Sequence, residues 1–175
     1  MSILVSAIEV GSVRAILPVC LELIRNGEIV YIEKKGHFLN EQVKDISLIE
    51  LPEDDQGLKF FFQERKIKKV LFSVNVHDSR PLKIARIANN LNIPTIHVLD
   101  YWNGYRSRME LDGLEIFLPS VYLVPDNFAR QKAIEEGIPE KLIKVTGQPA
   151  LASVGHLFKE NSKLEDPFIV LKNNN

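Results

Sequence analysis

The sequence predicts a single soluble α/β domain built on a twisted, mainly parallel sheet of about seven strands, with helices on both faces. Short apolar runs alternate along the chain with amphipathic helical patterns, which is typical of strand–helix–strand units. Glycine, asparagine and proline separate these segments where the helices are expected to end. Hydrophobic residues make up 45% of the chain and charged residues 26%, the balance of an ordinary globular protein.

The expected elements follow one another from the N-terminus. Strands are expected at Ile3–Ile8, Glu28–Glu33, near Ile46–Glu50, Lys69–Val74, Thr95–Leu99, Ser120–Val124 and Lys144–Thr146. Helices are expected from Gly11 to about Arg25, from Asp54-Asp55 through Arg65, from Pro81 to about Leu91, from Asp126 to Glu136, and from Gly147 to about Phe158. Gly27 and Gly137 are expected to end helices because glycine tolerates the left-handed cap conformation.

Charge and cysteine content argue against several classes of protein. The formal net charge is −1, unlike the strongly basic balance of most nucleic-acid binders. The only cysteine, Cys20, lies in an apolar helical pattern and is expected to be a small buried hydrophobe. The first residues resemble a strand and not a signal peptide, and no apolar run approaches the roughly 20 residues that span a bilayer. We therefore expect a cytoplasmic protein.

In an open parallel sheet, ligands bind in the crevice outside the carboxyl ends of the strands. The loop after the first strand carries Glu9, Gly11, Ser12 and Arg14, and its Gly-Ser helix opening offers backbone N–H groups to an anion. A plain strand-to-helix turn explains the same residues. No G-x-G-x-x-G or Walker A pattern is present, so a dinucleotide or ATP phosphate loop is not indicated.

A second polar loop follows the strand at Lys69–Val74 and reads Asn75-Val76-His77-Asp78-Ser79-Arg80. His77 beside Asp78 has the composition of an acid–base pair. Asp78 or Ser79 is also expected to cap the helix that follows. A cap explains one polar residue and not five, so both interpretations stay open.

The segment from Asp100 to Arg108 is the richest in binding side chains, with the only tryptophan, two tyrosines and two arginines after a strand end. Aromatic faces bind sugar rings or bases, and arginine forks bind phosphate or carboxylate. Trp102, Asn103 and Arg106 are therefore expected at a ligand surface or at a surface for a partner domain. The alternative is a loop whose aromatics pack on a neighbouring helix.

Metal binding and a serine-hydrolase triad are not indicated. The four histidines, His37, His77, His97 and His156, are dispersed without metal-ligand spacing. His97 lies within an expected strand and is interpreted as a core or edge residue. No G-x-S-x-G elbow is present.

Four stretches taken together resemble a known family. They are the Gly11-Ser12 loop with its long helix, Ile93–Val98, Val124–Pro139, and Val145-Thr146-Gly147-Gln148-Pro149-Ala150-Leu151. In order and spacing they are similar to the N-terminal Rossmann-like half of GT-B fold proteins. That superfamily includes many nucleotide-sugar glycosyltransferases and the UDP-N-acetylglucosamine 2-epimerases. The resemblance spans roughly residues 3 to 151.

The chain departs from the epimerase pattern at two places. The epimerases have Gly-Asp after the fourth strand, where this chain has His77-Asp78. They have a glutamate after His-Val in the fifth strand, where this chain has Leu99-Asp100. Epimerase activity is therefore not carried over, and an epimerase-like enzyme fragment is kept as an alternative.

The resemblance implies that residues 1–158 are the acceptor-side domain of a glycosyltransferase and that residues 159–175 are a tail or the start of a missing second domain. GT-B proteins look like two Rossmann-like domains with the active site between them, and the second domain supplies most nucleotide-sugar contacts. The domain is therefore expected not to be catalytic alone. The resemblance also implies no tightly bound cofactor, a nucleotide sugar as substrate, a glycan or small-molecule acceptor, and a C-terminal domain or partner subunit. A homo-oligomer stays open.

In this interpretation the candidate catalytic residues are His77, Asp78 and Asp100, with Asp78 or His77 as the base that activates an acceptor hydroxyl. The candidate ligand-binding residues share the carboxyl edge of the expected sheet: Glu9, Gly11, Ser12, Arg14, Trp102, Asn103, Arg106, Gly147 and Gln148. The rival hypothesis is a non-enzymatic interaction module that docks a partner through Tyr101–Arg108. A third hypothesis is a small enzyme that uses a free nucleotide, against which the missing glycine pattern counts.

Overall fold

The computed structural model of the protein describes residues 1–36, 46, 48–74, 78–111 and 115–151. Its centre is a sheet of seven parallel strands in the order β3-β2-β1-β4-β5-β8-β9. These strands are β1 (Ser2–Ser6), β2 (Ile29–Glu33), β3 (Leu48–Ile49), β4 (Lys69–Phe72), β5 (Thr95–Val98), β8 (Val121–Val124) and β9 (Ile143–Val145). Within the described residues, an antiparallel pair stands apart from the sheet, formed by β6 (Glu110–Leu111) and β7 (Glu115–Ile116).

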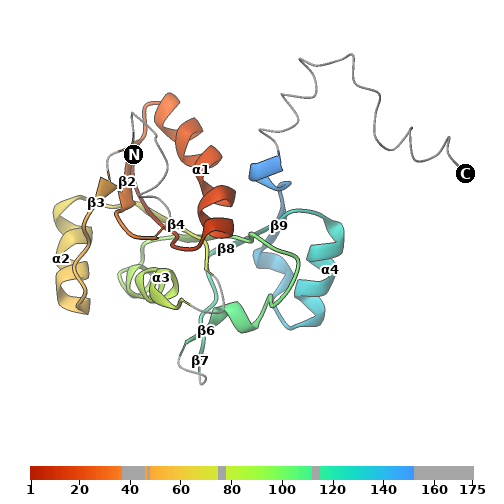
Figure 1. Ribbon diagram of the computed structural model, residues 1–175. Coiled ribbons are helices and arrows are strands. Elements are labelled where there is room, and N and C mark those ends of the chain that lie inside the picture. The colour runs from red at the N-terminus through yellow and green to blue at the C-terminus, as the bar shows by residue number, and fades with distance from the viewer. Residues whose placement is uncertain (37–45, 47, 75–77, 112–114, 152–175) are drawn as a thin grey trace, which may run out of the picture.

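Helices cover both faces of the sheet. They are α1 (Val10–Arg25), α2 (Asp55–Glu64), α3 (Arg80–Asn90) and α4 (Asn127–Glu135), with short 3-10 turns at Ser107–Met109 and Glu140–Leu142. Figure 1 shows α1 on one side of the sheet and α3 on the other. The predicted fold class, an α/β sheet wound with helices on both faces, is confirmed.

The core consists of two buried clusters, one on each face of the sheet. Ile3 and Val5 of β1 pack in the cluster that contains α1, whereas Leu4 packs in the cluster with α2, α3 and α4. Successive strand residues point to opposite faces, so both faces of β1 are apolar. This pattern explains why the central strands are continuous apolar runs in the sequence.

The strand order creates a switch point between β1 and β4. The chain moves outward from β1 through β2 to β3, then returns to β4 on the other side of β1 and continues through β5 to β9. Loops at the carboxyl ends of two such neighbouring strands diverge, which opens a crevice for ligands. The described residues of the polar loops after β1, β4 and β5 lie at this edge.

The helix boundaries follow the local chemistry of the sequence. Asp54 caps α2 by accepting the Gly57 N–H at 2.8 Å, and Pro81 lies in the first turn of α3. Gly137 follows the end of α4 and has a φ of +93°, a left-handed conformation that favours glycine. Cys20 is fully buried as expected, and burial raises the pKa of its thiol to about 12.

The structure differs from expectation between β5 and β8. The sequence predicts no helix or strand between Asp100 and Leu118. The structure has a 3-10 turn at Ser107–Met109 and the short β6–β7 pair in this stretch. Two-residue strands are too short to produce an alternating pattern, which is why the sequence did not reveal them. The start of the helix predicted from Gly147 lies within the described residues, of which 149–151 are helical. Its continuation to Phe158 and the proposed tail at 159–175 lie outside the described residues.

Candidate functional site

The N-terminus of α1 faces the carboxyl edge of the sheet. Glu9 occupies the cap position without a side-chain capping bond, and the first turn contains no acidic residue. Gly11 and Arg14 are exposed, whereas Ser12 is buried. Unpaired N–H groups and the dipole of a 16-residue helix make such an end favourable for negative charge.

A carboxylate of the protein itself already lies at this helix end. Asp100 follows β5, and its carboxylate accepts a hydrogen bond from the Ser12 hydroxyl at 2.9 Å. The same carboxylate forms an ion pair with the Arg108 guanidinium. The side chains of Asp100 and Arg108 are only 6% and 4% exposed. A Cβ on Gly11 would stand 3.1 Å from an Asp100 carboxylate oxygen, so glycine permits this close approach.

Arg108 ties several backbone segments to this carboxylate. Its guanidinium donates to the carbonyl oxygens of Val74 at 2.8 Å and Asn103 at 3.0 Å. The sequence singled out Arg106 as the binding arginine and missed the buried Arg108. Arg108 directly precedes the β6–β7 pair, and its burial depends on a chain path that local patterns did not predict.

Gln148 completes the arrangement from the far end of the chain. Its amide nitrogen donates to the Asp100 carbonyl oxygen at 2.9 Å, and its amide oxygen is buried without a hydrogen-bond partner among the described residues. Its neighbour Gly147 is exposed with φ of +85°. We call Ser12, Asp100, Arg108 and Gln148 the Asp100 cluster. It joins four segments at the carboxyl edge, and three of its members were candidates from the sequence.

Trp102 and Arg106 are directed toward α4. The indole nitrogen of Trp102 donates to Asp126 at 2.7 Å, and the same carboxylate caps α4 by accepting the Ala129 N–H. These bonds hold the pKa of Asp126 below its usual range. The Arg106 backbone N–H donates to the Glu136 carboxylate at 2.9 Å. Trp102 is half-buried, so its packing on a neighbouring helix, the alternative raised by the sequence, describes it well.

Two residues of this segment, Tyr101 and Asn103, are more accessible than Trp102. Tyr101 is 59% exposed and was not among the candidate site residues. Asn103 is exposed, and its side-chain oxygen accepts from Arg108 at 3.4 Å. Tyr101 and Asn103 are therefore the solvent-facing members of this segment that lie next to Trp102.

Asp78 directly precedes the cap position of α3, which Ser79 occupies without a side-chain capping bond. Its carboxylate accepts the Arg80 N–H at 2.9 Å, at the start of α3, and its side chain is half-buried. His77 lies outside the described residues. The acid–base pair predicted for these two residues therefore stays a prediction.

A second buried group at this edge was missed by the sequence interpretation. Glu33, at the end of β2 and only 2% exposed, accepts from the Ser6 hydroxyl and pairs with Arg80. Arg80 also pairs with Glu53 at 2.6 Å. A hollow of about 350 Å³ adjoins this group and is lined by Glu33, Lys34, Lys35, Glu50, Leu51, Glu53 and Arg80. A charged residue ending an apolar strand was the available clue to Glu33.

Three further observations concern metal ions, His97 and the membrane. Within the described ranges, no cluster of three His, Cys, Asp or Glu side chains is placed to hold a metal ion. His97 is fully buried in the core, one of the two placements expected for it. No helix of the described chain is both long and apolar enough to cross a membrane.

The chain has the fold of one half of several larger solved proteins. UDP-N-acetylglucosamine 2-epimerase from Rickettsia bellii matches with a TM-score of 0.62 and 18% identity over 98% of this chain and 51% of that one. The enzyme of the same name from Neisseria meningitidis, bound to UDP-GlcNAc, matches with a TM-score of 0.59 and 18% identity over 93% and 52%. Anabaena HepE in complex with UDP matches with a TM-score of 0.56 and 14% identity over 84% and 43%.

These likenesses establish the fold. The predicted resemblance to a GT-B-like half is confirmed at that level, and the chain spans about half the length of the solved structures that it matches. No protein-family description matches the sequence, and neither does any curated protein.

Proposed function

We propose that this chain is the N-terminal, acceptor-side half of a GT-B-like glycosyltransferase acting in sugar-nucleotide or cell-surface polysaccharide metabolism, and that it is not catalytic alone. The observation that carries the proposal is the match of nearly the whole chain to about half of larger proteins solved with UDP-GlcNAc, UDP or UDP-glucose. A second Rossmann-like domain, in the same polypeptide or in a partner, would close the site over the carboxyl edge.

The arrangement at the carboxyl edge of the sheet supports a role for Arg14 in binding a phosphate group. Arg14 is exposed in the second turn of α1, and within the described residues it has no ion-pair partner. Its guanidinium offers the paired N–H donors that suit a phosphate. The Asp100 cluster beneath it fixes the helix end and leaves Arg14 available.

The candidate base is Asp78. One oxygen of its carboxylate accepts the Arg80 N–H, and the second oxygen can accept a hydrogen bond from an acceptor hydroxyl. Asp100 is assigned a positioning role in this proposal because both of its carboxylate oxygens are engaged, by Ser12 and Arg108. A base must also be reachable by the hydroxyl whose proton it removes, and the Asp100 side chain is only 6% exposed.

The test measures the release of UDP from UDP-sugars by the natural protein, with a glycan extract of its source cells as the acceptor. Asp78→Asn should lower kcat by at least about 100-fold, the usual contribution of a general base. Arg14→Ala should raise the donor KM by about tenfold, because it removes a charged phosphate contact. The matched control is Arg25→Ala at the other end of α1, where an exposed pair with Glu22 makes no contribution to the site. Unchanged kinetics in both site variants would overturn the assignment.

A non-enzymatic interaction module is the second candidate, and one observation favours it. Tyr101 and Phe128 are 59% and 62% exposed, on two segments that the Trp102–Asp126 hydrogen bond holds together. Exposed aromatics next to an ordered loop are common in protein interfaces. Under this alternative, Tyr101→Ala and Phe128→Ala would release a partner subunit while UDP-sugar binding stayed unchanged.

A further inference from the structure

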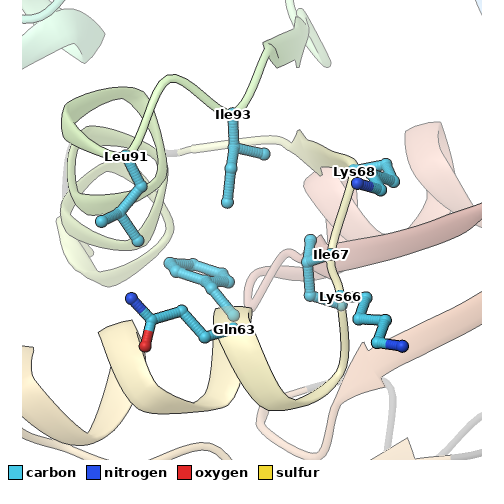
Figure 2. A pocket seen from close by; sticks show the side chains of 7 residues that line it. Gln63, Lys66, Ile67, Lys68, Leu91 and Ile93 are labelled. Carbon is cyan, nitrogen blue, oxygen red and sulfur yellow. The ribbon is translucent and has the colours of Figure 1, made fainter.

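A hollow of about 350 Å³ lies at the amino-terminal edge of the sheet, the edge opposite to the Asp100 cluster. It is lined by Phe62, Gln63, Lys66, Ile67, Lys68, Leu91 and Ile93. Figure 2 shows Ile67 and Ile93 directed into this space, with Lys66 and Lys68 on the side away from Leu91. The floor of the hollow is therefore apolar and one side of its rim is cationic.

The segment that supplies most of this lining is strongly basic although the whole chain is not, and two of its cations, Lys66 and Lys68, line the hollow. Residues 59–69 contain five basic residues and one acidic residue, whereas the formal net charge of the whole chain is −1. We call these five cations the basic edge: Lys59, Arg65, Lys66, Lys68 and Lys69. Arg65 lies over the Tyr31 ring, 5.8 Å from its centroid. Among the described residues, none of the four lysines forms an ion pair.

An exposed aromatic side chain lies on α2, the helix that also carries two of the lining residues, Phe62 and Gln63. Phe60 on α2 is 66% exposed, the largest exposed fraction among the large hydrophobic residues described. It precedes Gln63 by three positions, which places the two side chains on the same face of α2. An apolar ring exposed to water costs free energy in the isolated protein, and an anionic surface with an apolar interior would relieve that cost.

We propose that the basic edge, with Phe60, docks this protein on an anionic lipid surface. The lysine ammonium groups lie near the lipid phosphates, and Phe60 enters the boundary between headgroups and acyl chains. This attachment is peripheral. It leaves the carboxyl edge, with the Asp100 cluster, directed away from the lipid, and it does not depend on glycosyl transfer.

The type of cation favours a lipid surface over an acidic polypeptide. Four of the five cations are lysines, which act as mobile point charges and suit a diffuse layer of negative charge. Recognition of carboxylates on a protein favours arginine, whose fork makes directed paired bonds. The one arginine of the basic edge is held over Tyr31.

The test is co-sedimentation of the natural protein with vesicles of phosphatidylcholine, with and without phosphatidylglycerol. The wild-type protein should sediment only with the anionic vesicles, and added salt should release it. Each lysine near the surface contributes about fivefold to the partition coefficient, so Lys66→Gln/Lys68→Gln should weaken it by about 25-fold. Phe60→Ser should weaken it by about tenfold at any salt concentration.

The matched control carries the same loss of charge elsewhere. Lys141 and Lys144 are exposed at and next to β9, the end strand of the sheet, which is separated from β4 by β5 and β8. Lys141→Gln/Lys144→Gln should leave vesicle binding within twofold of the wild type. Equal loss in this control, or no wild-type binding to anionic vesicles, would overturn the proposal. Binding of the basic edge to polyglutamate but not to vesicles would overturn it in favour of an acidic polypeptide.

Discussion

His97 is a fully buried imidazole in the middle of β5. Its ring lies between Tyr122 at 4.6 Å and Phe72 at 5.1 Å, measured between ring centroids. Within the described part of the chain, neither ring nitrogen has a hydrogen-bond partner. Burial, with a smaller effect from the nearby Arg108 charge, lowers the pKa of His97 from 6.5 to about 3. The folded protein therefore holds this residue neutral.

This residue makes the folding stability depend on pH. The folded-state pKa of about 3 lies below the unfolded value of 6.5, so the unfolded chain binds the proton first as the pH falls. The stabilising contribution of neutral His97 is present above pH 6.5 and is lost as the pH falls from 6.5 toward 3. Between pH 7 and pH 5 the loss is about 2 kcal/mol.

Urea unfolding at these two pH values checks the prediction. The free energy of unfolding of the wild type should fall by about 2 kcal/mol more than that of His97→Leu, which cannot take up a proton. The carboxylates with lowered pKa, such as Asp54 and Asp126, lose their contribution at lower pH and are common to both proteins. Equal pH dependence in the two proteins would show that His97 is not the group responsible.

At the scale of elements, the segment between β5 and β6 is held by buried charge and not by regular structure. Asp100 and Arg108 pair across it, and Ser12 attaches it to α1. A buried ion pair loses several kcal/mol when one partner is removed, because the other charge is left without compensation. This segment should therefore loosen as a unit when either charge is removed.

A double-mutant cycle tests this coupling. Arg108→Met should lower the free energy of unfolding by about 3 kcal/mol, because it leaves the Asp100 carboxylate buried and unpaired. Asp100→Asn combined with Arg108→Met should cost less than the sum of the single variants, since no unpaired charge remains. Lys132→Met, in the exposed pair with Glu135, should change stability by less than about 0.5 kcal/mol. Additive costs at Asp100 and Arg108 would contradict the coupling.

The same segment marks the limit of what the sequence predicts. The strands of the sheet and the caps at Asp54 and Asp126 were predictable because their causes are local: apolar runs, turn residues and short side-chain bonds. The Asp100 cluster was only partly predictable. The Ser12–Asp100 hydrogen bond joins residues 88 positions apart, and no local pattern specifies such a pair.

Burial of individual charges was equally hidden. Arg106 and Arg108 look alike in the sequence, yet one is exposed and the other is almost fully buried. The ion pair between Glu33 and Arg80 was hidden in the same way, because it forms where the end of β2 meets the start of α3. Which member of a polar loop faces inward is decided by the tertiary path of the chain, and only the fold reveals it.

At the scale of the whole molecule, the central claim is that this chain forms one half of a two-domain site. The chain covers 51%, 54% and 52% of three larger proteins that share its fold. Its carboxyl edge presents the exposed Arg14, Tyr101 and Gly147 above a buried Asp100 cluster. A site open on one side is what the first half of such a protein would present to the second.

The mass and composition of the natural protein in its source cells test this claim most directly. An antibody raised against residues 1–151 would detect the protein on a denaturing gel and recover it for identification of bound chains. We predict either a polypeptide well above 19.9 kDa or a stable complex with a second Rossmann-like chain. A 19.9 kDa monomer that turns over a UDP-sugar without any partner would contradict the claim.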